Sequence, residues 1–283
     1  MPLSTVRLTG DIAVTLHKPD LPAGPAVILC HGFCGIQEIL LPAFVEAFTT
    51  AGFIAITFDY RGFGASGGER GRLVPAMQID DIVTVIDWAS AQPAITNIGL
   101  WGTSFGGCHV FGAAALRPAV SCVVSQLAFA DGEAVVTGNL SAEEKAGFIA
   151  TLDKMAAKQA ATGKETFVAI TRVLNDDESK TFFNSHKAQF PAMDIKIPFL
   201  TVRETLRYKP AANASQVTCP TMVMIAGKDR VNPPEQGIAL FEAVAAKEKK
   251  LHIEADARHY DMYSGPNFNN IVGQQIGWYK KWL

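Results

Sequence analysis

The most informative short segment of the chain is Gly102-Thr103-Ser104-Phe105-Gly106, in which a serine stands between two glycines. The apolar run 97–101 before it is typical of a buried strand, and the run 105–116 after it has helical spacing. A serine at such a strand-to-helix turn needs small flanking residues, because larger side chains would collide there. Its hydroxyl is then exposed above the sheet edge, and the amide of Phe105 faces any anion that forms beside it. The segment predicts Ser104 as a nucleophile.

A second glycine-containing loop, His31-Gly32-Phe33-Cys34-Gly35, follows the apolar run 26–30. If that run is a parallel strand, its loop emerges at the same end of the sheet as Ser104. The backbone amides of Phe33 or Cys34 are then candidates for an oxyanion hole, together with that of Phe105. Such donors stabilise the charge that develops on a carbonyl oxygen under attack. The alternative interpretation is a flexible glycine turn with no chemical role.

Two further polar residues, Asp229 and His259, each follow an apolar run of strand length late in the chain. An aspartate, a histidine and a serine at one sheet edge can act as orienting acid, general base and nucleophile. The chain order Ser, Asp, His is the order found in serine hydrolases built on open α/β sheets. The sequence therefore predicts Ser104, Asp229 and His259 as the catalytic residues, with Asp256 as the alternative acid.

Short continuous apolar runs alternate with longer segments of helical spacing over most of the chain. The predicted strands are an N-terminal hairpin, 6–8 and 12–16, and the runs 26–30, 53–58, 97–101, 120–127, 221–225 and 251–254. The predicted helices cover 40–51, 75–91, 105–116, 234–246 and 268–282. This alternation is typical of a mostly parallel sheet with helices on both faces, so we expect a doubly wound α/β fold.

Residues 130–215 interrupt the alternation, because they contain helix formers, scattered charges and aromatic residues but no convincing pair of strands. We expect helices at 141–159 and 165–174. The segment predicts an inserted helical cap over the mouth of the sheet, with 1–129 and 216–283 forming the core. The alternative is a set of ordinary peripheral helices.

The predicted cap is rich in phenylalanine. Phe148, Phe182 and Phe183, together with His186, are candidates for binding an apolar acyl or aromatic group of a substrate. The rings would equally serve to attach the cap to the core, and His186 would equally suit a solvated position.

The composition argues against several classes of protein. Of the 283 residues, 48% are hydrophobic and 18% charged, which is enough for a large buried core. The net charge of −2, without any run of Lys or Arg, argues against nucleic acid or an anionic membrane surface as partner. The apolar runs are far shorter than the roughly 20 residues of a membrane span. No secretory signal is visible and the five cysteines show no disulfide or zinc spacing, so we expect a cytoplasmic protein with free thiols.

Residues 62–67 resemble a dinucleotide-binding motif. The glycines of 62–67 follow a Gly-x-Gly-x-x-Gly pattern after a predicted strand, but the loop continues to Pro75 before a helix begins. A pyrophosphate would find no helix N-terminus there. Cys34 and Cys108 are interpreted as small packing residues near the predicted site. We expect neither a metal nor an organic cofactor, and the sequence leaves a homodimer open.

These features resemble the α/β-hydrolase fold superfamily, from residue 26 to the C-terminus apart from the predicted cap. The loop 59–66 resembles one that many members carry. Within the superfamily the chain is most similar to the dienelactone-hydrolase-like and esterase-like groups. True dienelactone hydrolases have a cysteine where Ser104 stands, and the His-Gly-Gly-Gly loop of the hormone-sensitive-lipase group is absent.

The resemblance implies a serine hydrolase that cleaves a small-molecule carboxylic ester or thioester through an acyl-enzyme. Acyl transfer by the same three residues, and aminopeptidase-like or perhydrolase activity, are the alternatives within enzymes. A non-catalytic ligand-binding protein on the same fold is the alternative outside them.

Overall fold

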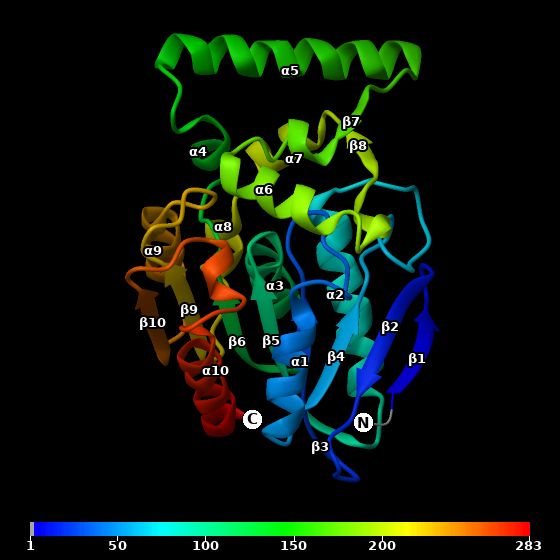
Figure 1. The fold of residues 1–283 in the computed structure, drawn as a ribbon, viewed down its shortest axis with the longest axis vertical. Helices are drawn as coiled ribbons and strands as arrows, with labels where there is room; N and C mark the ends of the chain where they lie inside the picture. The colour runs from blue at the N-terminus through cyan, green and yellow to red at the C-terminus, as the bar shows by residue number, and fades with distance from the viewer. Residues whose placement is uncertain (1–2) are drawn as a thin grey trace.

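The computed structural model describes residues 3–283. Its centre is an eight-stranded sheet with the strand order β1-β2-β4-β3-β5-β6-β9-β10 (Figure 1). Only the β1–β2 and β2–β4 pairings within this sheet are antiparallel, and the remaining strands run parallel to one another. The strand bounds are Leu3–Leu8 (β1), Ile12–His17 (β2), Gly24–Cys30 (β3), Ile54–Phe58 (β4), Ile95–Thr103 (β5), Val120–Gln126 (β6), Thr221–Ala226 (β9) and Lys249–Glu254 (β10). The expected mostly parallel sheet is confirmed.

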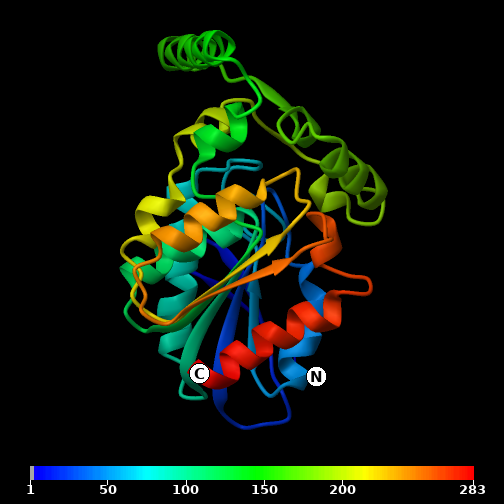
Figure 2. The same ribbon diagram turned by 90° about the vertical axis from the view of Figure 1, so that its left-hand side faces the viewer.

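Helices cover both faces of the sheet, as Figure 2 shows. One face carries α1 (Leu41–Thr50) and α10 (Phe268–Trp282), and the other carries α2 (Pro75–Ser90), α3 (Phe105–Leu116), α8 (Pro210–Ala214) and α9 (Pro234–Ala243). The predicted bounds of α3 and α10 are confirmed, and the other predicted helices of the core are found within a few residues. None of the helices described within residues 3–283 is both long and apolar enough to cross a membrane.

The central strands contribute side chains to two cores, one on each face. In β3, Ala26, Ile28 and Cys30 pack into the core beneath α2, α3 and α9, whereas Val27 and Leu29 pack into the core beneath α1 and α10. All five side chains are fully buried. Because successive side chains of a strand point to opposite faces, burial of both faces requires a continuous apolar run.

The connections around β3 place its loop next to the loop after β5. The chain leaves β3, passes through α1 on one face and enters β4 on one side of β3. It then crosses the other face through α2 and enters β5 on the opposite side of β3. The loops after β3 and β5 therefore lead to helices on opposite faces of the sheet. A crevice forms between two such loops, and ligands of open α/β sheets bind in this kind of crevice.

The segment between β6 and β9 forms a layer over the carboxyl ends of the strands (Figure 1). It contains α4 (Gly132–Thr137), α5 (Ala142–Thr162), β7 (Phe167–Ala169), η1 (Ile170–Arg172), α6 (Asp177–His186), η2 (Pro191–Met193), β8 (Lys196–Pro198) and α7 (Thr201–Arg207), followed by α8 at the side of α3. The long helix α5 lies furthest from the sheet, at the outer edge of this layer in both views. We call the elements from α4 to α7 the cap layer.

One expectation for the cap layer is wrong. Residues 165–174 do not form a helix, because 167–169 pair as β7 with the antiparallel strand β8 and a short 3-10 helix follows at once. A strand pair is therefore present where none was expected. The apolar spacing of 165–174 fits a helix, but pairing with a strand almost thirty residues later in the chain decides the conformation.

An ion pair and a ring stack are among the side-chain contacts that attach the cap layer to the core. Arg72 of the core makes a bidentate ion pair with Glu165, with nitrogen–oxygen distances of 2.7 and 2.5 Å. On the other side, the ring of Phe182 in α6 stacks on Tyr260, with ring centroids 4.3 Å apart. Burial raises the pKa of Tyr260 to about 12, so its hydroxyl stays protonated and donates to Ser179 Oγ at 3.2 Å. Helix α6 is thereby held against the residue that follows His259.

Candidate active site

Ser104 occupies a strained turn between β5 and α3. Its backbone angles, φ 53° and ψ −118°, lie in a region that residues with side chains rarely adopt. A Cβ atom at Gly102 would lie 2.4 Å from the carbonyl oxygen of Gly106, and one at Gly106 would lie 2.3 Å from that of Cys30. The turn is fixed further because the Ser104 amide donates to the carbonyl oxygen of Gln126 at 2.8 Å. The predicted steric reason for the two glycines is confirmed.

Asp229 and His259 form a buried pair, with His259 Nδ1 2.7 Å from Asp229 Oδ2 and side-chain exposures of 3% for His259 and 1% for Asp229. The other carboxylate oxygen accepts hydrogen bonds from the amides of Val231 and Asn232, at 2.8 and 2.9 Å. A carboxylate at Nδ1 favours the tautomer in which Nδ1 carries the proton and Nε2 is free to accept one. His259 and Ser104 line the same small chamber.

Asp256, the alternative acid, lies elsewhere. Its side chain is 85% exposed and forms an ion pair with Lys228, with a nitrogen–oxygen distance of 2.6 Å. Among the acids considered, the structure therefore joins Asp229 and not Asp256 to His259.

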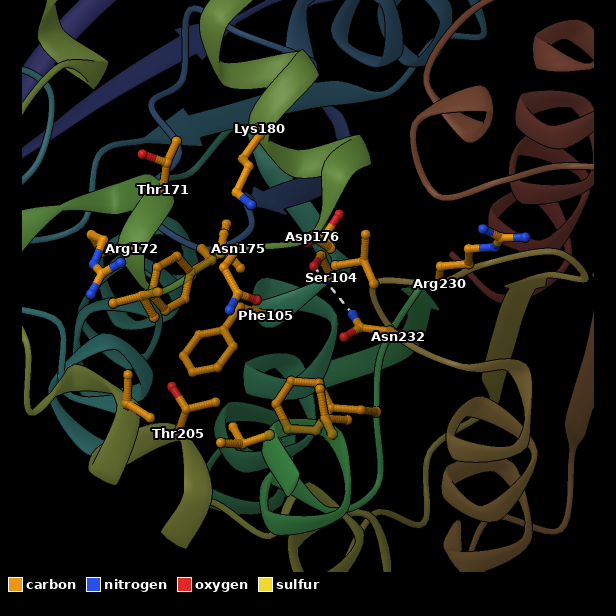
Figure 3. Close-up of a pocket in the computed structure, with 18 of the residues that line it drawn as sticks. Ser104, Phe105, Thr171, Arg172, Asn175, Asp176, Lys180, Thr205, Arg230 and Asn232 are labelled. Atoms are coloured by element: carbon orange, nitrogen blue, oxygen red, sulfur yellow. Dashed lines mark hydrogen bonds between the residues drawn. The ribbon is translucent and has the colours of Figure 1, made fainter. Parts of the chain in front are cut away.

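Asn232 is a residue of the site that the sequence analysis missed. Its side-chain nitrogen donates to Ser104 Oγ at 3.3 Å, shown by the dashed line in Figure 3, and to the carbonyl oxygen of Leu127 at 2.7 Å. The Leu127 contact fixes the orientation of the amide beside the serine. Its position three residues after Asp229 is a local signal, but nothing in the sequence shows that this loop folds back onto the loop after β6.

The loop after β3 lies directly against Ser104. A Cβ atom added at Gly32 would lie 3.2 Å from Ser104 Cβ. The loop turns tightly, since the Gly35 amide donates to the carbonyl oxygen of Gly32 at 3.1 Å, and Cys34 within the turn has a φ of 54°. At the start of α3, the amide of Phe105 is one of the first four in the helix, which have no partner within it. The loop and the helix N-terminus thus approach the serine from two sides.

Two chambers meet at Ser104. The large chamber has a volume of about 750 Å³ and lies under α4, α5 and α7. The small chamber has a volume of about 80 Å³ and lies under α6. Ser104 and Phe33 line both chambers, whereas His259 lines the small one.

The predicted substrate-binding residues divide between the two chambers. Phe148 lines the large chamber, and Phe182 and Phe183 line the small one. His186 is not among the described residues that line either chamber. Its ring packs against Phe182, and its Nδ1 lies 2.8 Å from the carbonyl oxygen of that residue.

The two cysteines close to the site have the surroundings of packing residues. Burial raises the pKa values of the Cys34 and Cys108 thiols, so both stay protonated near neutral pH. Cys108 Sγ also accepts a hydrogen bond from the amide of Phe129 at 3.4 Å. Both cysteines lack the lowered pKa that marks a thiolate nucleophile.

Helix α3 carries a buried neutral histidine below the serine. His109 Nε2 lies 2.9 Å from Gln78 Oε1 and its Nδ1 lies 3.0 Å from the Tyr208 hydroxyl. The Gln78 carbonyl can only accept, so Nε2 carries the proton and Nδ1 accepts from tyrosine. Burial lowers the pKa of His109 from its ordinary value of 6.5 to about 3.

This histidine predicts a loss of stability in acid. The unfolded chain binds a proton at His109 below about pH 6.5 and the folded chain does not, so stability is complete above that pH and falls toward pH 3. The contribution is about 1.4 kcal/mol per pH unit. The variant His109→Gln cannot titrate at this position, and we expect it to be less stable than the wild type at pH 7. The difference between the two unfolding free energies should be smaller at pH 5 by about 2 kcal/mol, because only the wild type loses stability in acid. Urea unfolding at the two pH values measures it, and an unchanged difference would contradict the assignment.

Comparisons with known proteins identify the family to which the chain belongs. An Escherichia coli protein described as "Uncharacterized 31.7 kDa protein in traX-finO intergenic region" is 58% identical, over 100% of both chains. The thiohydrolase aneE of Aspergillus aculeatus is 26% identical over 89% of this chain and 84% of its own.

The crystal structure of the α/β hydrolase GrgF from Penicillium sp. sh18 superposes with a TM-score of 0.82 and 19% identity, covering 100% of this chain and 99% of that one. A sequence model of the alpha/beta hydrolase fold matches residues 25–266, a range that runs from the second residue of β3 past β10 and includes all the site residues described above. The chain therefore belongs to the α/β hydrolase fold family.

Proposed function

We propose that this protein is a serine hydrolase that cleaves a carboxylic ester or thioester through an acyl-enzyme on Ser104. The observation that carries the proposal is the buried hydrogen bond between Asp229 and His259, together with the position of His259 in the same chamber as the strained serine. The similarity to a thiohydrolase supports the thioester as one form of the substrate.

In the proposed first step, the Ser104 hydroxyl attacks the carbonyl carbon while His259 Nε2 takes its proton. Asp229 holds the imidazole in the required tautomer and stabilises its cationic form. The carbonyl oxygen becomes an oxyanion, for which the amides of Phe105 and of Phe33 or Cys34 are the proposed donors. His259 then gives its proton to the departing alcohol or thiol, and the acyl group remains on the serine.

In the second step, a water molecule attacks the acyl-enzyme with His259 as base. The carboxylic acid leaves and the serine is restored. An alcohol or amine in place of water would give acyl transfer by the same residues.

The experiment is a screen of p-nitrophenyl esters and N-acetylcysteamine thioesters of graded acyl length, with wild-type protein and Ser104→Ala. We expect turnover by the wild type and, without added acceptor, release of the free acid. Transfer to an added alcohol in preference to water would identify an acyltransferase. Equal rates for the two proteins on every substrate would rule out the proposed function.

A further inference from the structure

The large chamber carries an excess of positive charge. Arg172, Lys180 and Arg230 line it, and Asp176 is the single carboxylate among its described lining residues. Asp176 is already engaged, because its Oδ1 accepts a hydrogen bond from the Ser179 amide at 2.8 Å at the start of α6. Among residues 3–283, the three cationic side chains form no ion pair and no side-chain hydrogen bond. The chamber is therefore cationic although the whole chain carries a net charge of −2.

Unpaired arginines are uncommon elsewhere in this protein. Seven of the ten arginines bind a carboxylate or a carbonyl oxygen through the guanidinium group. Two of the remaining three, Arg172 and Arg230, line the large chamber. Lys180 is half-buried, whereas Arg172 and Arg230 are exposed. Lys180 therefore loses part of its hydration without gaining a partner, which is destabilising, and a bound anion would remove that cost.

The three cationic side chains extend in different directions (Figure 3). In this view Lys180 extends from α6 toward Asn175, and Lys180, Arg172 and Thr171 all lie on the same side of Ser104. Arg230 extends away from the other labelled residues. Lys180 and Arg172 are therefore the two cations placed to meet a bound molecule.

Many of the residues that line the chamber are apolar. They belong to α4, α5, α7, the turn before α7 and the loop after β6, and include Phe129, Val135, Val136, Phe148, Phe199 and Val202. A chamber lined by both apolar and cationic side chains fits a molecule that has a hydrocarbon body and a negative charge. Its volume is in the range of pockets that enclose small-molecule ligands.

The position of His259 indicates which half of the substrate enters this chamber. The imidazole must protonate the leaving group, so the leaving group lies on the side of His259, which is the small chamber. The acyl group then extends from Ser104 into the large chamber.

We propose that the large chamber selects an acyl group that carries a carboxylate, and that Lys180 and Arg172 bind that carboxylate. The inference rests on the proposed function and specifies its substrate class as monoesters or monothioesters of dicarboxylic acids. Arginine can bind a carboxylate through two parallel hydrogen bonds, and lysine supplies a mobile point charge.

The test compares two N-acetylcysteamine thioesters of equal length, suberyl and octanoyl, which differ in the terminal carboxylate. We expect the wild type to prefer the suberyl thioester by at least about tenfold in kcat/KM, and Lys180→Met to lose roughly ten- to a hundredfold on that substrate alone. Lys180→Arg should restore most of the preference. Lys154→Met removes an equivalent charge from the exposed surface of α5 and should change neither rate.

Other results would distinguish failure of the carboxylate site from failure of the proposed function. Equal wild-type rates on the two thioesters, or equal losses on both in Lys180→Met, would overturn the carboxylate site while leaving the hydrolase intact. If Lys180→Met instead lowered kcat/KM for octanoyl-coenzyme A but not for octanoyl-N-acetylcysteamine, the cation would bind an anion of the thiol group. That result would overturn the assignment of the large chamber to the acyl group. Failure of the proposed function is distinct, because it would abolish Ser104-dependent turnover of the octanoyl thioester as well.

Discussion

Replacing Ser104 by alanine is expected to lower kcat/KM for a reactive ester or thioester by about 10³- to 10⁶-fold. The reason is that the variant has no oxygen to form the acyl-enzyme, so only binding and electrostatic stabilisation remain. The fold should persist, because the Ser104 side chain accepts one long hydrogen bond, from Asn232, and the turn is held by backbone contacts. Steady-state kinetics on purified protein measure the effect.

The matched control is Ser215→Ala, which removes an exposed hydroxyl at the end of α8. We expect it to retain the wild-type rate. A Ser104→Ala variant within tenfold of wild type, with an unchanged melting temperature, would show that the reaction does not pass through this oxygen.

The second large effect is expected for Asp229→Asn, which should reduce kcat by about 10⁴-fold. An asparagine can keep its carbonyl oxygen on the amides of Val231 and Asn232, so the loop should stay in place. Its NH₂ group then faces His259 Nδ1, which favours the tautomer with the proton on Nε2. That tautomer cannot accept the proton of Ser104.

Asp256→Asn is the control for this prediction, because Asp256 was the alternative acid and lies exposed beside Lys228. It should change kcat by less than about twofold. A large loss in Asp256→Asn together with a small one in Asp229→Asn would reverse the assignment of the orienting acid.

Local patterns allowed the core of the fold to be predicted from the sequence. The runs in β3, β5, β6 and β9 are continuous because both faces of these strands are buried. The elbow at Ser104 was predictable because its two glycines are required by contacts within a few residues and with the adjacent β3 loop. Asp229 and His259 were predictable because the carboxyl ends of parallel strands meet at one edge.

The cap layer was less predictable, because contacts distant in the chain determine it. The strand β7 forms only through its pairing with β8, and Glu165 before it is held by Arg72 of the core. The same limit applies to the site. Asn232 reaches Ser104 because the loop after β9 packs on the loop after β6, and this packing has no signature in either segment.

The two chambers could not be predicted from the sequence either. Lys180 and Arg172 belong to different short elements and are ordinary surface residues by sequence. Only the arrangement of α6 and η1 over Ser104 places them along one cavity. The phenylalanines could be proposed as lining residues by type alone, but not assigned to one chamber or the other.

The proposed reaction requires that Ser104 is the single nucleophile of this protein. The most direct test is treatment with a fluorophosphonate, followed by peptide mapping with mass spectrometry. We expect one phosphonyl group per chain, located on Ser104, with activity lost in proportion to labelling and no labelling of Ser104→Ala. A stoichiometric adduct on any other residue, or wild-type protein that turns over substrate yet never reacts, would contradict it.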